Sequence, residues 1–487
     1  MLFKTLFNDW FKLSLILITL LGLAIRIFFL NTRPITYDEG QSLMFTRTDL
    51  VQLVKGTMAD AHPPGYFLLI YFWAKINSSL SFIRFLSVIF GIVTIFIAGG
   101  VGKKLLGNKA GILTALLVSL SPVYIFESTN ARMYSLSVLA SFLIINFFFN
   151  FLKKQNLLNS FLLGLTLLVG IYIHYYFVFA IFALSFSVLF VYPQYKRKWF
   201  QLLTIILIFA FPLFIGYLKS DHPLFLVSNS LLKIPGLFVT FLISWDAIQV
   251  LKIYPFPGLN NLLLSSVLII FLSLFFCILG MKRIAPQKAL FQFLTVYLLL
   301  PILVVLLISY AVKPILGIRS FIIFSPAFYL VLAKGLETKG HKLTKIGLVV
   351  FVVLFLFGQY QGFKNTLNLY APFNYVFEDS SPGDLYAYSD PYFLTIGRYY
   401  IESDRHISLV PTWIAPEMAN AMGYVETDWE NNSKDTKQLW YFRLEDQYYK
   451  GDQAEKVQKE LEVKYPVVFT KEYPDLKLNL TLFDLRK

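Results

Sequence analysis

Two adjacent carboxylates occur early in the chain, in the segment Thr36-Tyr37-Asp38-Glu39-Gly40. The first 361 residues contain only nine acidic residues, so an adjacent pair is distinctive in this part. A carboxylate close to apolar groups has a raised pKa and can accept a proton from a hydroxyl group. The pair therefore predicts a general base, and the competing interpretation is an ordinary solvated turn.

Four cationic side chains near the ends of apolar runs predict a phosphate-binding site. An arginine can bind two phosphate oxygens at once, which favours Arg132 and Arg319 over the point charge of Lys313. His62 precedes a Pro-Pro-Gly segment and an apolar run, where the free N–H groups of a helix start favour an anion. The competing interpretations are a snorkelling side chain for Arg132 and an interfacial histidine for His62.

Aromatic residues close to these groups are candidates to line a substrate site, namely Tyr37, Tyr134, His174 and Tyr176. The aromatic belt at a membrane surface is a competing interpretation of the segment around His174. The sequence contains no phosphate-binding glycine loop and no HExxH or GxSxG motif. The single Cys277 excludes an internal disulfide and a cysteine-based metal cluster.

The composition of the chain indicates that membrane-spanning helices position these residues. The chain has 487 residues, of which 57% are hydrophobic and 15% charged, with a mean hydropathy of +0.63. Soluble globular proteins contain about 25% charged residues, so a cytosolic globular enzyme is excluded. A helix needs about 20 apolar residues to cross a bilayer. We predict an α-helical polytopic protein with about eleven spans, near residues 11–30, 82–102, 110–126, 133–151, 157–173, 175–193, 199–218, 261–281, 290–309, 320–335 and 345–361.

The basic residues indicate how these spans are oriented. Of the 29 Lys and Arg residues before position 362, 17 lie in alternate loops on one side, which the positive-inside rule assigns to the cytoplasm. The same pattern accounts for the net charge of +14 without nucleic acid as a partner. We therefore expect a multi-pass protein of the inner or plasma membrane, with a cytoplasmic N-terminus and an extracytoplasmic C-terminal part.

Two domains are predicted from the distribution of charge. Residues 1–361 carry a net charge of +20 and should form the catalytic membrane domain, with juxtamembrane helices in a first outer loop at 31–81. Residues 362–487 carry a net charge of −6 and have the composition of an extracytoplasmic α/β domain. Its predicted elements are strands at 384–389, 406–410, 438–443 and 476–485 and a helix at 453–465.

Three local features complete these predictions. Basic clusters at both ends of the apolar stretch 159–192 require a hairpin with His174 at its outer tip. The run 234–245 is too short to cross and suits a re-entrant or interfacial piece. In the C-terminal domain, tryptophans could stack on sugars, and the competing interpretation places them in its core, namely Trp413, Trp429 and Trp440.

The order of short motifs resembles that of the GT-C glycosyltransferases. The similar branch contains the protein O-mannosyltransferases and the lipid A aminoarabinose transferase, especially their bacterial relatives. The motifs cover roughly residues 10–345 and comprise Tyr37-Asp38-Glu39, His62-Pro63-Pro64-Gly65-Tyr66, Arg84-Phe85-Leu86-Ser87, Gly102–Gly107, Ser121-Pro122, Ala131-Arg132-Met133-Tyr134, His174-Tyr175-Tyr176, Arg319, Pro326 and Ala333-Lys334-Gly335-Leu336.

This resemblance implies a membrane glycosyltransferase of the cell envelope. Its donor would be a sugar linked to a polyprenyl phosphate, transferred with inversion to an extracytoplasmic glycan, lipid or protein. Asp38 would act as the base with Glu39 beside it, and Arg132 and Arg319 would bind the donor phosphate. His62 and Lys313 are weaker candidates for that contact. The lipid-linked sugar is the only small-molecule partner implied; a divalent metal is compatible with this chemistry, but nothing in the sequence indicates one.

A multi-span lipid or glycan transporter or flippase is the main alternative. A transporter predicts broken helices and polar residues in the middle of the membrane, whereas the polar clusters here lie at the outer ends of the spans. A structural or polymer-ligating membrane protein is a further alternative. That class would need one large outer loop in the middle of the chain, and the sequence has none.

Overall fold

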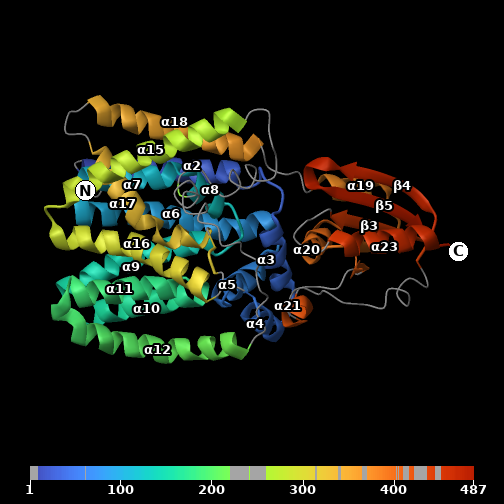
Figure 1. Cartoon of the computed structure of the whole chain (residues 1–487), viewed down its shortest axis with the longest axis horizontal. Coiled ribbons are helices and arrows are strands. Elements are labelled where there is room, and N and C mark those ends of the chain that lie inside the picture. Colours follow the sequence, from blue (N-terminus) through green and yellow to red (C-terminus); the bar gives the residue numbers. More distant parts are fainter. Residues whose placement is uncertain are drawn as a thin grey trace. The chain divides into compact units, whose positions relative to one another are not determined.

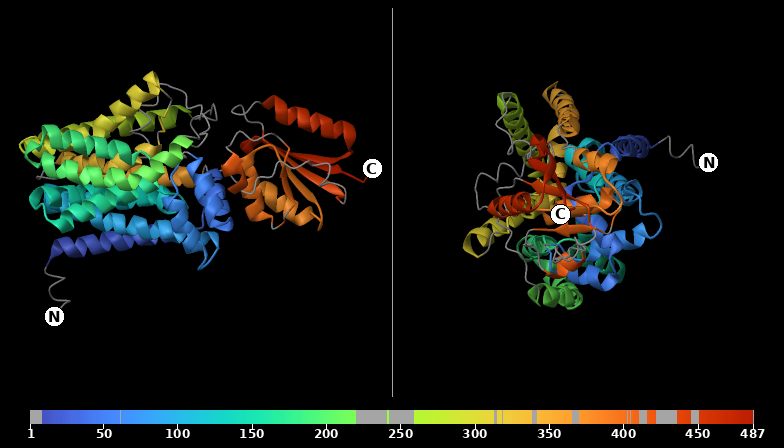
Figure 2. Two further views of the ribbon diagram at one scale, coloured as in Figure 1. Left: turned by 90° about the horizontal axis from the view of Figure 1, so that it is seen from below. Right: turned by 90° about the vertical axis from the view of Figure 1, so that its right-hand side faces the viewer.

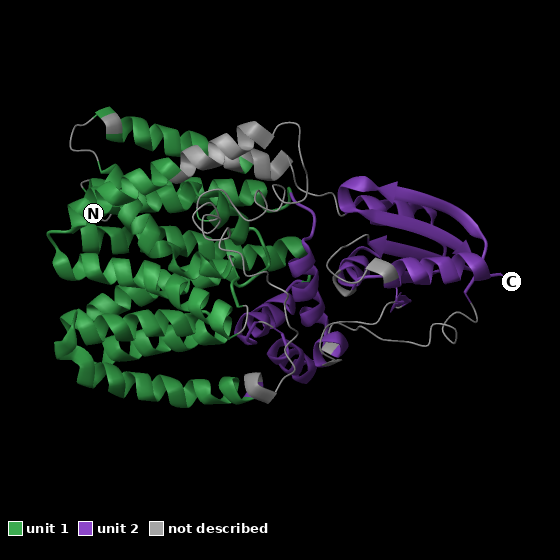
Figure 3. Cartoon of the chain, in the orientation of Figure 1, with its two compact units in different colours: residues 1–32, 78–215, 224–365 green, residues 33–77, 216–223, 366–487 purple. Residues whose placement is uncertain are grey.

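The structure is a computed structural model that describes residues 9–60, 62–219, 241, 259–312, 315–317, 319–337, 342–364, 370–401, 403, 405–409, 416–421, 436–444 and 451–486. The chain divides into two compact units (Figure 3). Unit 1 consists of residues 1–32, 78–215 and 224–365, and unit 2 of residues 33–77, 216–223 and 366–487. By packing, the segment 33–77, which falls in the predicted first outer loop, therefore groups with the C-terminal segment. The domain boundary after residue 361, which the sequence analysis drew from composition, stays a prediction.

Each of the eleven apolar runs contains a helix. Figures 1 and 2 show the helices of unit 1 running side by side. They are α2 (Trp10–Phe29), α6 (Leu80–Leu106), α7 (Asn108–Leu120), α8 (Pro122–Ser128), α9 (Tyr134–Lys153), α10 (Leu157–Ile173), α11 (Phe177–Phe190), α12 (Lys196–Lys219), α15 (Leu259–Ile284), α16 (Lys288–Ala311), the short η2 (Arg319–Phe324) with α17 (Ser325–Leu336), and α18 (Lys342–Lys364).

The described helices are those of a multi-pass membrane protein. Six are long and apolar enough to cross a bilayer, and a seventh is added if α7 and α8 form one span bent by 60°. The bend occurs at Ser121-Pro122, because proline starts α8 without an N–H group to continue α7. The full count of eleven crossings stays a prediction. The re-entrant segment predicted at 234–245 lies outside the described residues except for Phe241.

The hairpin predicted within 159–192 is confirmed. Helix α10 ends at Ile173, α11 begins at Phe177, and His174, Tyr175 and Tyr176 form the connection. Because His174 and Tyr176 lie at this turn, they can approach residues at the same ends of other helices. The backbone closes the turn through a hydrogen bond of 3.1 Å from the Phe177 amide to the His174 carbonyl.

Unit 2 combines short helices of the first outer loop with a mixed sheet. The loop contributes α3 (Tyr37–Arg47), α4 (Leu50–Met58) and α5 (Gly65–Ala74). The C-terminal segment contributes α19 (Ala371–Asp379), β1 (Leu385–Tyr388), α20 (Pro391–Tyr400), β2 (His406–Ser408), α21 (Pro416–Ala421), β3 (Gln438–Leu444), α23 (Gly451–Lys464), β4 (Val467–Tyr473) and β5 (Leu478–Asp484). The strand order is β2-β1-β3-β5-β4; β1 pairs in parallel with β2 and β3, and β5 is antiparallel to β3 and β4.

Helices pack on both faces of the sheet (Figure 2), and successive side chains of a strand point to opposite faces. One face packs Leu385, Leu439 and Phe483 against Leu461 of α23. The other face carries aromatic rings that pack against α19 and α20, including Tyr388 and Phe442 of the sheet, Phe373 of α19 and Phe393 of α20. The predicted strands and the helix at 453–465 are confirmed. The edge strand β4 was missed, because its largely exposed side chains lack an apolar alternation.

Trp440 is a core residue of this sheet. It is 0% exposed, its indole N–H donates to Asp384 at 3.0 Å, and its ring contacts Phe469 edge-on at 5.6 Å. The suggestion that Trp440 stacks on sugars is therefore wrong. Trp413 and Trp429 lie outside the described residues.

Candidate active site

A buried cationic cluster forms in unit 1 where three connections meet. Arg132 lies between α8 and α9, His174 between α10 and α11, and Arg319 at the start of η2. Burial, and then the charges of Arg132 and Arg319, lower the pKa of His174 from 6.5 to about 3. His174 is therefore neutral at physiological pH, and it can donate or accept a hydrogen bond without adding charge.

Aromatic rings pack around these cations. The Arg319 guanidinium carbon lies 4.2 Å from the centroid of the Tyr134 ring, a cation–π distance. The Tyr134 ring lies 5.8 Å from that of His174, which lies 5.3 Å from that of Tyr176. The structure thus brings together three of the four residues predicted to line a substrate site. Tyr37, the fourth, belongs to unit 2.

Arg319 also forms an ion pair that the sequence analysis missed. Its Nε donates to Glu127 Oε1 at 2.7 Å and its Nη2 to Oε2 at 2.8 Å. The side chains are 12% exposed for Arg319 and 1% for Glu127, so the pair is largely out of water. The one available signal was an acidic residue inside an apolar run, which in a membrane protein marks a functional or structural site.

Tyr176 holds the segment that precedes Arg319. Its hydroxyl donates to the Ile315 carbonyl and accepts from the Gly317 amide at 2.8 Å. The Ser320 amide donates to the Gly317 carbonyl at 3.1 Å, which continues this turn into η2. Tyr176 is thus a support for the Arg319 segment as well as a neighbour of His174. Lys313 lies outside the described residues.

Asn130 adds neutral polar atoms beside Arg132. The residue is 0% exposed, and neither atom of its side-chain amide has a hydrogen-bond partner in the described part of the chain. Arg132 is 2% exposed, and its backbone N–H donates to the Asn130 carbonyl at 2.8 Å. Unpaired buried amides are costly, so this turn suits contact with a polar ligand.

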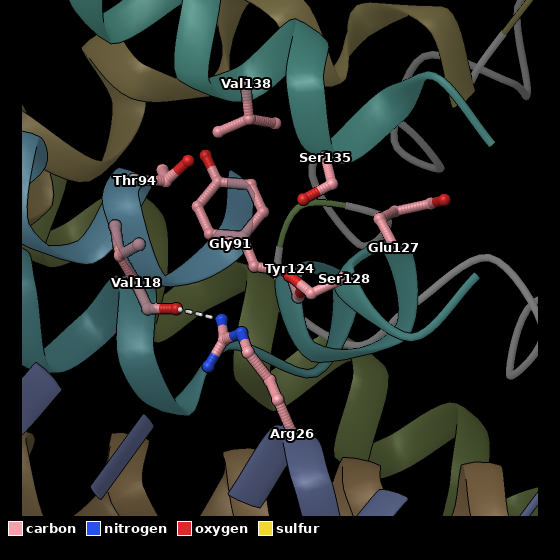
Figure 4. A pocket seen from close by; sticks show the side chains of 9 residues that line it. All are labelled: Arg26, Gly91, Thr94, Val118, Tyr124, Glu127, Ser128, Ser135 and Val138. Atoms are coloured by element: carbon pink, nitrogen blue, oxygen red, sulfur yellow. Dashed lines mark hydrogen bonds between the residues drawn. The ribbon is translucent and has the colours of Figure 1, made fainter. Parts of the chain in front are cut away.

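A further buried arginine, Arg26 of α2, was not predicted. It is 0% exposed, and its guanidinium donates to the carbonyls of Gly22 and Ser119 at 3.1 Å and of Val118 at 3.4 Å. With Glu127, Arg26 lines a small cavity between α2, α6, α7, α8 and α9 (Figure 4).

The acidic pair lies at the first turn of α3 in unit 2, where its two members have different surroundings. Thr36 caps the helix: its side chain accepts from the Glu39 amide, and the Glu39 carboxylate accepts from the Thr36 amide, both at 3.2 Å. Glu39 is 0% exposed, whereas Asp38 is half-buried. Glu39 therefore fixes the start of the helix, and Asp38 is the carboxylate more accessible to a substrate.

The remaining predicted residues of unit 2 are Tyr37, the first residue of α3, and His62. The Tyr37 ring lies 6.2 Å from that of Phe393. His62 precedes the two prolines before α5 and is half-buried. A third carboxylate, Asp60, is 2% exposed and accepts from the Gln41 amide at 3.2 Å; the sequence analysis had not singled it out.

The predicted base and the predicted phosphate-binding arginines thus belong to different units, so their convergence stays a prediction. Among the described residues, no three His, Cys, Asp or Glu side chains gather in a way that could hold a metal ion. The chemistry that these residues themselves offer is proton transfer by a carboxylate and binding of an anion by buried arginines.

Comparison with known proteins supports the resemblance. The family described as dolichyl-phosphate-mannose-protein mannosyltransferase matches residues 61–216. No curated protein matches the chain in sequence. The crystal structure of ArnT from Cupriavidus metallidurans in the apo state is similar with a TM-score of 0.60 and 10% identity, over 96% of this chain and 97% of that one. The structure of ArnT bound to undecaprenyl phosphate is similar with a TM-score of 0.58 and 11% identity, over the same shares.

At this level of identity the similarity establishes the fold. It extends over nearly all of both chains, so it includes the helical part and the C-terminal sheet. The expectation of a helical membrane protein with a C-terminal α/β domain is confirmed. This chain therefore has the GT-C fold of membrane glycosyltransferases.

Proposed function

We propose that this protein transfers a sugar from a polyprenyl-phosphate donor to a hydroxyl group of an extracytoplasmic glycan, lipid or protein. The observation that carries this proposal is the buried cluster of Arg132, His174 and Arg319, in which the Tyr134 ring lies 4.2 Å from the Arg319 guanidinium carbon and 5.8 Å from the His174 ring. Among the described residues of unit 1, four arginines are buried or largely buried (Arg26, Arg84, Arg132 and Arg319), and Glu127 is the one buried carboxylate. Such an excess of positive charge favours an anionic ligand.

The comparisons support a lipid phosphate as that anion. One similar structure is bound to undecaprenyl phosphate, and the matching family takes its description from dolichyl-phosphate-mannose. A sugar joined to a phosphate is already activated for transfer, so the reaction needs no nucleotide site. The absence of a phosphate-binding glycine loop from the sequence agrees with this donor.

In the proposed reaction, Asp38 takes the proton of the acceptor hydroxyl while its oxygen attacks the anomeric carbon. The new C–O bond forms on the face opposite the phosphate, the bond to the phosphate oxygen breaks, and the configuration inverts. Negative charge then grows on the departing polyprenyl phosphate, where the guanidinium groups of Arg132 and Arg319 stabilise it. We infer that this site faces the extracytoplasmic side of the inner or plasma membrane, because 17 basic residues lie in alternate loops that the positive-inside rule assigns to the cytoplasm.

The test is transfer of labelled sugar by membranes that contain the full chain. A panel of polyprenyl-phosphate sugars is supplied, and both the labelled product and the released polyprenyl phosphate are measured. We expect release to depend on Asp38 and on the acceptor. A flippase would move the intact donor between leaflets without breaking the sugar–phosphate bond, and that result would contradict the proposal.

A further inference from the structure

Helix α3, which carries Asp38, is largely buried although seven of its eleven residues are polar, charged or glycine. Every residue from Glu39 to Thr46 is buried, including Gln41 and Ser42. A polar helix of eleven residues is not stable alone in water and depends on tertiary packing. Within unit 2, α3 packs against α20, which lies more than 340 residues further along the chain.

The contacts between these helices cover both ends of α3. Just before the helix, the Ile35 amide donates to the Tyr400 hydroxyl at 3.3 Å. At its last turn, Arg47 donates to the Arg398 carbonyl at 3.1 Å, and its guanidinium carbon lies 5.7 Å from the Tyr399 ring. These contacts at both ends of α3 prevent it from sliding along α20.

The closest approach lies two residues after Asp38, at Gly40. A Cβ atom built on Gly40 would lie 2.5 Å from Thr395 Oγ1 and 3.2 Å from Ile396 Cγ1. A Cβ atom essentially never lies 2.5 Å from another heavy atom, so a side chain here would require the Thr395 side chain to move or the two helices to separate. Thr395 and Ile396 are both 0% exposed and cannot move aside into solvent.

Helix α20 is itself held firmly by the sheet domain. Asp390 caps its start, accepting from the Phe393 amide at 2.8 Å. Phe393, Leu394 and Ile396 are 0% exposed, and the Phe393 ring packs on Phe373 at 5.0 Å. The surface offered to α3 is therefore as rigid as the core of the domain.

We propose that α20 positions the general base: Thr395 and Tyr400 hold the first turn of α3 so that the Asp38 carboxylate meets the acceptor hydroxyl. This inference rests on the proposed function. It assigns the C-terminal domain a role in turnover without a catalytic group of its own. Small errors in the placement of a base slow the chemical step more than they weaken donor binding.

The test compares full-length variants in the sugar-transfer assay. Gly40→Ala should lower kcat by roughly 10–100-fold with little change in KM for the donor. Adding Thr395→Ala removes the closest clash and should restore most of the turnover. Tyr400→Phe creates no clash and should lower kcat by about 3–10-fold through the lost hydrogen bond; it remains informative if Gly40→Ala fails to fold.

Two matched controls separate positioning from general damage. A Cβ on Gly100 of α6 would meet nothing within 4 Å of the described chain, so Gly100→Ala should retain turnover. Tyr370, the residue before α19, donates to Asn374 at 2.8 Å and its ring lies 4.9 Å from that of Tyr400. Tyr370→Phe keeps this ring contact and loses only a hydrogen bond remote from α3, so it should also retain turnover. Unchanged kcat in both Gly40→Ala and Tyr400→Phe, or a loss confined to KM for the acceptor, would overturn the inference.

Asp38→Asn, measured in parallel, distinguishes this inference from the proposed function. If Asp38→Asn is inactive while Gly40→Ala and Tyr400→Phe are fully active, Asp38 remains the general base and only its positioning by α20 is wrong. If Asp38→Asn retains full turnover, the proposed role of Asp38 fails, whatever the effect of the other variants.

Discussion

Arg319 and Glu127, separated by 192 positions in the sequence, form a two-point ion pair with N–O distances of 2.7 and 2.8 Å. The pair connects η2 to α8 and places the Arg319 guanidinium on the ring of Tyr134. Arg319, which is predicted to bind the donor phosphate, is therefore held in a fixed orientation by the Glu127 carboxylate. A prearranged cation needs little reorganisation when charge develops on a leaving group.

Glu127→Gln tests the importance of this pair for folding. The substitution leaves Arg319 without its buried counter-charge, so we expect the free energy of unfolding to fall by about 3–5 kcal/mol. Thermal unfolding of the purified protein in detergent measures the effect. The exposed pair Glu455–Lys459 provides the control, because Glu455→Gln should leave the unfolding temperature unchanged. Equal unfolding temperatures for Glu127→Gln and the wild type would show that the pair is not stabilising.

Arg132 and Arg319 are both expected to bind the donor phosphate. Arg132→Lys conserves charge but loses the planar fork, so it should impair donor binding and turnover, and Arg132→Ala should impair them more. Loss of one charge-assisted contact in a largely dry site costs about 2–4 kcal/mol. Donor affinity and turnover are measured for each alanine variant and for the double variant. If neither alanine variant changes them, the phosphate is bound elsewhere.

Asp38 and Glu39 should respond differently to amide substitutions. Asp38→Asn conserves shape but removes the proton acceptor, so turnover should fall by about 10²–10⁴-fold while donor binding changes little. Glu39→Gln conserves an acceptor for the Thr36 amide and should change turnover far less, because glutamine also closes a capping box. Near-normal turnover in Asp38→Asn would make Glu39 the next candidate for the base.

His406 should make unit 2 less stable in mild acid. Burial lowers the pKa of His406 from 6.5 to about 4, and its Nδ1 and Nε2 contact the Tyr388 hydroxyl and the Ile401 carbonyl, both at 3.0 Å. Below about pH 6.5, His406 binds a proton in the unfolded chain but stays neutral in the folded chain. The free energy of unfolding therefore decreases as the pH falls towards 4. Between pH 7 and about 5 the loss should be roughly 1–3 kcal/mol. Unfolding of the wild type and of His406→Gln across this range measures it, and identical pH profiles would contradict the assignment.

The orientation in the membrane can be tested with reporter fusions. We expect a reporter fused after Gly362 to be extracytoplasmic, because 17 basic residues lie in alternate loops on the opposite side. A reporter fused in the 153–156 loop, which carries Lys153 and Lys154, should be cytoplasmic and serves as the control. A cytoplasmic signal after Gly362 would overturn the topology and the placement of the proposed site.

Local pattern and composition were sufficient for much of the fold. Apolar runs of membrane length predicted the helices, and the basic residues flanking 159–192 predicted the turn at His174. Continuous apolar and aromatic runs predicted the buried strands β1 and β3, whereas the exposed edge strand β4 was missed. These features depend on neighbours in the sequence, since burial in lipid or in a sheet imposes a short-range period on the side chains.

Contacts between distant segments were decided by the tertiary structure alone. The sequence identified Arg132, Arg319 and His174 as candidates, but it did not indicate the ion pair with Glu127 or the buried Arg26. It also did not indicate that α3 packs on α20, where the Ile35 amide and the Tyr400 hydroxyl are 365 positions apart. Such pairings follow from the three-dimensional packing of whole elements, in which a buried charge must meet its counter-charge and a polar helix must find a partner, and no local period in the sequence encodes them.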